Sequence, residues 1–147
     1  MVDSNVRTIA QNLYALQEKR VAVYRKLERS HEVYLHSGPA NGFPTFRQAV
    51  HEATEAFQKI SHDVLSLREE ARDTWPLLAV HMEQLQAAES EKLHLTVELQ
   101  LAKQHLQNFP DEEKEDEVRR LKHRINTTIE KIGNIMEDFK YDSEDIR

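Results

Sequence analysis

Residues 37–44 read Ser37-Gly38-Pro39-Ala40-Asn41-Gly42-Phe43-Pro44 and form the clearest break in the chain. Two glycines and two prolines within eight residues disfavour a continuous helix, because glycine has a low helix propensity and proline lacks a backbone donor. On both sides of this break apolar residues recur at spacings of three and four, as on the buried face of an α-helix. The stretch therefore predicts a loop that joins two long antiparallel helices.

The same apolar spacing continues through the rest of the chain. It predicts helices at about residues 5–36, 45–72, 75–108 and 112–140, followed by a short acidic tail at 141–147. Two further breaks separate the later helices. Each contains residues that favour the start of a new helix, since proline fits the first helical turn and acidic residues interact favourably with the positive N-terminal end of the helix dipole. These breaks are Asp73-Thr74-Trp75-Pro76 and Phe109-Pro110-Asp111.

The third predicted helix carries two apolar rows. One row contains Leu78, Met82, Leu85, Leu95, Leu99 and Leu106, and the other contains Leu93, Val97 and Leu101. A helix that is apolar on more than one side usually packs against more than one neighbour. We therefore expect this helix to contact two or more partners.

Four helices joined by short links pack most simply with sequential neighbours antiparallel. We expect an all-α fold, an antiparallel bundle of four long amphipathic helices that forms a single domain over residues 1–147. The near-heptad regularity also fits elongated coiled-coil hairpins or a homodimer. Periodicity alone does not separate these architectures.

The composition excludes several classes of protein. The chain has no cysteine, so it has no disulfide framework and no thiol nucleophile, which fits a reducing compartment. Its N-terminus lacks a basic start followed by an apolar run, and no apolar stretch approaches the roughly 18 residues of a membrane span. We expect an intracellular protein without a membrane association.

The net charge of −6 is unevenly distributed. Residues 1–50 carry a net charge of +3 and the remaining residues carry −9. The first helix contains a candidate basic patch made of Lys19, Arg20, Arg25, Lys26 and Arg29. Because the rest of the chain is acidic, direct nucleic-acid binding through this patch is an alternative that we do not favour.

No sequence pattern indicates catalysis, a cofactor or a metal site. The nearest approach to a metalloprotease motif is His51 with Glu55, which lacks the second histidine. An antiparallel hairpin centred on the break would bring His31 and His51 to one level, near Glu28 and Glu55. We interpret this level as a structural polar clamp, with a metal site as the alternative.

The residues around the break are the best candidates for a functional surface. Aromatic and apolar side chains gather there, and such a loop either caps the core or presents an anchor to a protein partner. Arg47 could also bond to the free carbonyls at the end of the first helix. The candidate partner-binding residues are Tyr34, Leu35, Ser37, Gly38, Pro39, Phe43, Pro44, Phe46, Arg47 and His51.

At this point the sequence resembles a known family. The required-for-excision B-domain family has similar residues at Arg25-Lys26-Leu27-Glu28, His31, Tyr34-Leu35, Ser37-Gly38-Pro39, Phe43-Pro44, Phe46-Arg47, Val50-His51-Glu52, Thr54 and Phe57. The ending Phe139-Lys140-Tyr141-Asp142-Ser143-Glu144 is similar to the family's C-terminal signature. The resemblance implies a small helical protein linked to DNA excision repair and placed in the nucleus, with no catalytic residues to carry over.

Three hypotheses follow from these observations. The favoured one is a non-enzymatic helical adaptor or scaffold that holds a protein partner in a DNA-repair assembly. The second is a weak nucleic-acid binder that uses the basic first helix and Arg119-Arg120-Leu121-Lys122-His123-Arg124. The third is a structural coiled-coil subunit of a complex unrelated to repair, which would be cytoplasmic.

Overall fold

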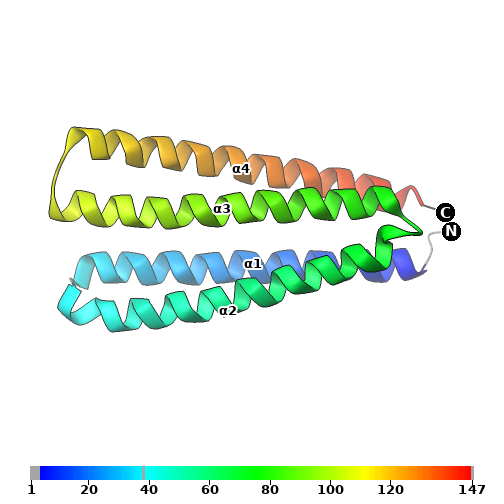
Figure 1. Cartoon of the computed structure of the whole chain (residues 1–147), viewed down its shortest axis with the longest axis horizontal. Helices are drawn as coiled ribbons and strands as arrows, with labels where there is room; N and C mark the ends of the chain where they lie inside the picture. The colour runs from blue at the N-terminus through cyan, green and yellow to red at the C-terminus, as the bar shows by residue number, and fades with distance from the viewer. Residues whose placement is uncertain (1–3, 38, 147) are drawn as a thin grey trace. The chain divides into compact units, whose positions relative to one another are not determined.

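The computed structural model describes residues 4–37 and 39–146, with the backbone alone for Ser4 and residues 39–41. The described residues form four long helices and no strand; the first two helices run antiparallel to each other, and so do the last two (Figure 1). The helices are α1 (Ser4–Ser37), α2 (Pro39–Arg72), α3 (Pro76–Asn108) and α4 (Glu112–Glu144). The expected all-α fold class is confirmed.

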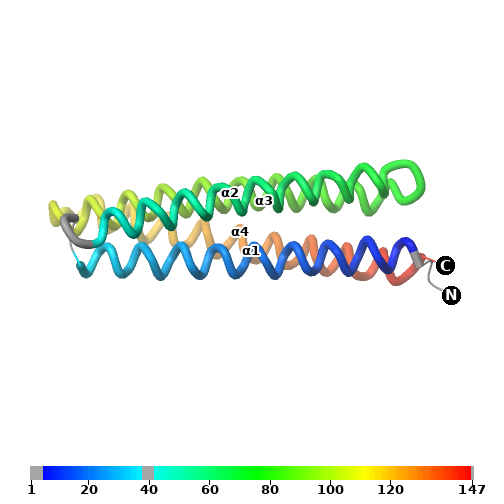
Figure 2. Tube along the Cα trace, turned by 90° about the horizontal axis from the view of Figure 1, so that it is seen from below, coloured from blue at the N-terminus to red at the C-terminus, as the bar shows by residue number. Residues whose placement is uncertain are grey.

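The helices group into two compact units. Unit 1 comprises the chain as far as Glu83 together with the C-terminal residues from Phe139, and unit 2 comprises Gln84–Asp138. Within unit 1, α1 and α2 pack against each other, closest at the hairpin end, and α2 draws away from α1 toward Arg72 (Figure 2). The most completely buried side chains of unit 1 come from all four helices and include Val6, Leu13, Val64, Leu78, Met82 and Phe139.

The expected loop from Ser37 to Pro44 is wrong, and so is the expected start of the second helix at residue 45. Helix α2 begins at Pro39 and continues through Pro44. Proline is favoured at the first position of a helix, where its missing N–H would have no partner in any case. Pro44 lies close to the same end, so it removes only one early hydrogen bond. The cost of this second proline is offset by contacts that need residues 42–46 to be helical.

The decisive contact is the close approach of α2 to α1 at Gly42. A Cβ atom at this position would lie 2.9 Å from Tyr34 Cα, 3.2 Å from Tyr34 Cδ1 and 3.3 Å from Ser37 Cβ. Only glycine leaves room for the two helix backbones at this distance. Gly42 and Phe46 are one helical turn apart, so a helical conformation places both of them against α1.

The C-terminal residues expected to form a tail instead continue helix α4. Helix α4 extends to Glu144, through residues that were expected to follow it. Phe139 and Ser143 are buried one turn apart, and the Phe139 ring meets the Tyr14 ring edge to face with their centroids 6.1 Å apart. His81 Nε2 lies 2.6 Å from Asp142 Oδ2. These contacts attach the end of α4 to α1 and to the start of α3 within unit 1.

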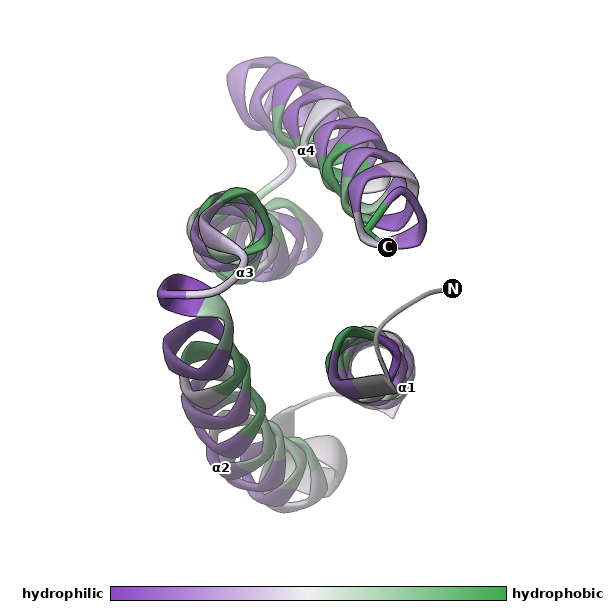
Figure 3. Ribbon diagram, turned by 90° about the vertical axis from the view of Figure 1, so that its right-hand side faces the viewer, coloured by the Kyte–Doolittle hydropathy of each residue, from purple (hydrophilic) through white to green (hydrophobic). Residues whose placement is uncertain are grey.

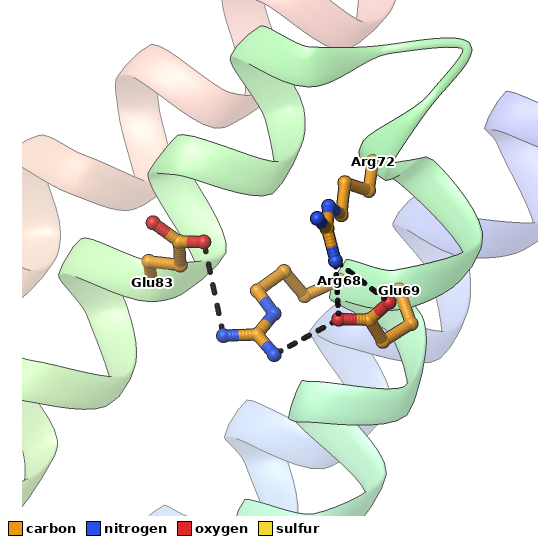
Figure 4. A network of polar contacts seen from close by, with 4 residues as sticks. All are labelled: Arg68, Glu69, Arg72 and Glu83. Atoms are coloured by element: carbon orange, nitrogen blue, oxygen red, sulfur yellow. Dashed lines mark hydrogen bonds and ion pairs between the residues drawn. The ribbon is translucent and has the colours of Figure 1, made fainter.

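A tight turn connects α2 to α3. The Trp75 N–H donates to the Ala71 carbonyl over 2.7 Å, and the Leu78 N–H donates to the Trp75 carbonyl over 3.0 Å. Beside this turn, Arg68 lies 3.1 Å from a carboxylate oxygen of Glu69 and 3.7 Å from one of Glu83 (Figure 4). Exposed ion pairs of this kind contribute about 1 kcal/mol or less, so burial at the helix faces dominates the stability of unit 1.

Unit 2 is an antiparallel pair formed by α3 and α4. Its core contains Leu95, Ala102, Val118 and Leu121, with Leu99, Leu106 and Ile125 packed against them. Green apolar and purple polar residues alternate around α3, whereas α4 is purple over most of its ribbon (Figure 3). The second apolar row of α3 was expected to contact another helix, but Val97 and Leu101 are exposed. That expectation is wrong for these two residues.

Two glycine substitutions test the close approach of α1 and α2. Gly42→Ala should lower the free energy of unfolding by about 1–3 kcal/mol, because the new methyl group overlaps backbone atoms of Tyr34. Gly133→Ala is the matched control in α4, where a Cβ atom would meet nothing within 4 Å. This control should raise the free energy of unfolding by about 0.5–1 kcal/mol, because alanine has a higher helix propensity than glycine. Urea denaturation would measure both, and equal effects would refute the steric explanation.

Candidate partner-binding site at the helical hairpin

The α1–α2 hairpin ends in a cluster of aromatic rings. Tyr34 and Phe46 are stacked with an interplanar angle of 4° and centroids 5.1 Å apart. The Phe43 ring lies 5.9 Å from Tyr34, and the His31 ring lies 5.1 Å from Phe46. Aromatic pairs at these separations add to the stabilisation that burial alone provides. The cluster therefore stabilises the end of the hairpin, and its buried and half-buried part, formed by His31, Tyr34 and Phe46, is called the brace below.

Exposure divides the candidate residues into two groups. Tyr34 is only 5% exposed and Phe46 is half-buried, so these side chains belong to the brace. Phe43 is 46% exposed and Val50 is 38% exposed, and the Arg47 side chain between them is also exposed. Phe43, Arg47 and Val50 follow the spacing of one helix face and are called the hairpin face below. Val50 was missed as a site residue because its spacing from Phe46 assigned it to the buried face of the second helix; its signal was the spacing from Phe43.

The remaining candidates lie around this face. Leu35 is half-buried, while Ser37 and Pro44 are exposed. Gly38 lies outside the described residues, and only the backbone of Pro39 is described. Partner binding by this set stays a prediction.

The structure does not bring His31 and His51 to one level. His31 is buried and packs against the rings of Phe46 and Tyr34. His51 is exposed and forms an ion-pair contact with Glu55 in its own helix, with Nε2 3.2 Å from Oε1. The expected level assumed a turn centred near residue 41. In the structure Phe46, five residues before His51 on α2, packs against His31 instead.

The candidate basic patch is smaller than the sequence indicated. Arg20 is buried, and its guanidinium donates to Gln17 Oε1 over 2.8 Å and to Ser61 Oγ over 3.5 Å. Lys19, Arg25, Lys26 and Arg29 are exposed. Arg25 and Arg29 line an open depression on the outer face of α1 together with Ala22, Glu28 and Glu32. Two carboxylates in this depression weaken its attraction for phosphate.

Lys26 forms a polar bridge from α1 to α2. Its Nζ lies 3.4 Å from Glu52 Oε2, and Gln48 Nε2 donates to Glu52 Oε1 over 3.3 Å. The hydrogen bond from Gln48, followed by the hydrogen bond and charge of Lys26, lowers the pKa of Glu52 below its ordinary value. This bridge flanks the hairpin on an exposed surface.

The described residues contain no group of three or more histidine, aspartate or glutamate side chains that could hold a metal ion. In the same part of the chain, none of the helices has the length and apolarity that a bilayer crossing requires. The feature that stands out at the hairpin is thus a surface with an apolar and cationic character.

Comparisons with known proteins identify the family. The profile described as DNA repair REX1-B matches residues 8–103, which include all of α2 and most of α1 and α3. The chain belongs to the DNA repair REX1-B family. The earlier resemblance, carried by the residues around the hairpin, is confirmed.

Two mammalian relatives extend the REX1-B match. They are the Required for excision 1-B domain-containing proteins of Bos taurus and Mus musculus, each 33% identical over 144 residues. The alignments cover 97% of this chain, and they cover 79% of the bovine and 83% of the mouse protein. No solved structure matches the chain. The alignments with these relatives thus extend over α4, which lies beyond the residues matched by the REX1-B profile.

Alanine substitutions separate the brace from the hairpin face. Tyr34→Ala should reduce the free energy of unfolding by about 3–5 kcal/mol, because it removes a buried ring between two helices. Phe43→Ala should cost about 1 kcal/mol or less, since nearly half of that side chain is already in solvent. Thermal and urea unfolding would measure both. A Phe43→Ala loss as large as that of Tyr34→Ala would place Phe43 in the brace.

The polar bridge gives a prediction for pH. Because the pKa of Glu52 is lowered in the folded chain, the bridge stabilises the hairpin at neutral pH and this contribution is lost as the pH falls through that lowered pKa. Gln48→Ala should raise the pKa of Glu52 towards its ordinary value, as measured by NMR titration of the carboxyl carbon. Thr54→Ala is the control, since Thr54 donates to the Val50 carbonyl instead. An unchanged Glu52 titration in Gln48→Ala would contradict the assignment.

Proposed function

We propose that this chain is a non-enzymatic adaptor in DNA excision repair and that it holds a protein partner on the hairpin face. Membership of the DNA repair REX1-B family supports the link to repair. The names of the bovine and mouse relatives, which describe a requirement for excision, support the same process. A role in excision repair implies that the protein acts in the nucleus.

The main support for the proposal is that the hairpin face combines exposed apolar side chains with an exposed arginine. Phe43 and Val50 present apolar surface on either side of Arg47. Aromatic and arginine side chains are the residue types that most often dominate binding energy at protein interfaces. The buried stack of Tyr34 on Phe46 holds this turn of α2 in place. A partner therefore meets a preorganised surface and loses little free energy to ordering it.

The charge around the hairpin indicates the chemistry of the partner. Residues 19–51 contain six lysine or arginine residues and two glutamates, a net charge of +4 in a chain whose total is −6. Arg47 is the cation within the hairpin face, and Lys26 and Arg29 lie on the neighbouring helix. We expect the partner to present apolar side chains to Phe43 and Val50 and carboxylates to Arg47. Such complementarity raises the association rate and excludes basic competitors.

Two depressions on the described surface do not resemble the site of a small-molecule substrate. One is confined to the outer face of α1, and another is lined by charged side chains around the start of α4, including Asp111, Glu113, Lys114 and Arg120. Neither encloses apolar walls around convergent polar groups, as the site of a small-molecule substrate usually does.

Survival after ultraviolet irradiation tests this function in cells that lack the chain. The parent chain should restore survival, and the variant Phe43→Ala with Arg47→Glu should fail to do so because partner capture is lost. Affinity purification from the same cells should recover excision-repair proteins with the parent and not with the variant. Equal expression and an unchanged helical circular-dichroism spectrum would show that the variant is folded.

Val33→Ala provides the matched control, because Val33 is an exposed apolar residue of α1 outside the hairpin face. It should restore survival as well as the parent does. Full rescue by the hairpin-face variant would refute the assigned surface. Normal survival of cells without the chain would refute the role in repair and favour a structural subunit of another complex.

A further inference from the structure

An exposed apolar row runs along the second half of α3, in unit 2. Val97 is 45% exposed, Leu101 is 63% exposed and Phe109, directly after the helix, is 66% exposed. His105 completes the spacing of four residues, and its ring lies 5.4 Å from the Phe109 ring. Residues four apart on a helix are neighbours on one surface line. Val97, Leu101, His105 and Phe109 are called the α3 ridge below.

The α3 ridge differs from the scattered exposed apolar residues of an ordinary surface. Single exposed leucines or valines need no explanation, whereas a contiguous apolar patch with a polar border is typical of an interaction site. The opposite side of α3 already supplies Leu95 and Ala102 to the core of unit 2. The ridge is thus a second apolar face of the same helix.

Charge is distributed unequally on the two flanks of the ridge. One flank carries the exposed carboxylates of Glu91 and Glu98, which are seven residues apart and therefore on one side of the helix. The other flank carries Gln100, which is uncharged. Residues 84–138 contain eight basic and twelve acidic side chains, a net charge of −4. The ridge is consequently bordered by negative charge on one side only.

We propose that the α3 ridge binds a cationic amphipathic helix of a protein partner. The apolar residues of that helix pack against Val97, Leu101 and Phe109, and its lysine or arginine residues lie against Glu91 and Glu98. A row of side chains spaced by four residues fits the groove between rows on another helix. A second copy of this chain is a poorer occupant, because it would bring another unit with a charge of −4 to the same surface. This surface and its partner are separate from those of the hairpin face.

Two synthetic helical peptides provide the probes. Both carry leucine at the two core positions of about four heptads, and they differ only in having lysine or glutamate at the positions that would face Glu91 and Glu98. Fluorescence anisotropy with the intact chain should give at least ~10-fold tighter binding of the lysine peptide. Leu101→Asp should weaken that binding by at least ~10-fold, because it places a charge in the apolar contact. The double variant Glu91→Lys with Glu98→Lys should reverse the preference between the peptides.

Matched variants give this test its control. Leu77→Asp alters another apolar residue of α3 that is 55% exposed, but it lies in unit 1 and should leave peptide binding unchanged. Phe43→Ala should also leave it unchanged, so a failure here is distinct from a failure of the hairpin face. Circular dichroism would confirm that each variant is folded.

Three results would overturn the proposal. The first is equal binding of both peptides, and the second is no effect of Leu101→Asp. The third is a dimer in sedimentation experiments that Leu101→Asp dissociates, because the ridge would then be occupied by a second copy.

Discussion

The close approach of two helix backbones at Gly42 is the constraint on which the hairpin depends. With a Cβ atom at this position only 2.9 Å from Tyr34 Cα, any other residue would force α1 and α2 apart. The absence of a side chain lets the aromatic rings of Tyr34 and Phe46 stack directly beside this contact. The stacking in turn favours a helical conformation for residues that glycine and proline would otherwise destabilise.

This contact also fixes the register of the two helices. Phe46 rather than His51 lies against His31. Farther along, Tyr24 meets Phe57 with ring centroids 4.6 Å apart, and Arg20 reaches Ser61. The placement of one glycine therefore decides which side chains are buried and which form the exposed hairpin face. The same short segment around Gly42 thus determines both the packing of the hairpin and the surface proposed to bind a partner.

Much of the fold was predictable because apolar periodicity reports directly on helix faces. Leu13, Val64 and Phe139 follow this periodicity and are buried. The early start of α2 was not predictable, because the propensities of Pro39, Gly42 and Pro44 describe an isolated chain. A tertiary contact with Tyr34 reverses them. The candidate site was predictable as a region but not in detail, since exposure depends on a register that periodicity leaves open. The polarity of Arg20 likewise gave no sign that its guanidinium is buried against α2.

The family to which the chain belongs is named for DNA repair, and its members need not share a reaction for that name to have a physical meaning. An adaptor must offer at least two surfaces that discriminate between partners. The proposed hairpin face lies in a cationic part of unit 1, whereas the proposed α3 ridge is bordered by carboxylates in unit 2. Partners suited to one surface would be repelled by the other, because like charges brought together at an interface are costly. The uneven charge of the chain would then direct each partner to its own surface, an acidic partner to the hairpin face and a basic partner to the α3 ridge.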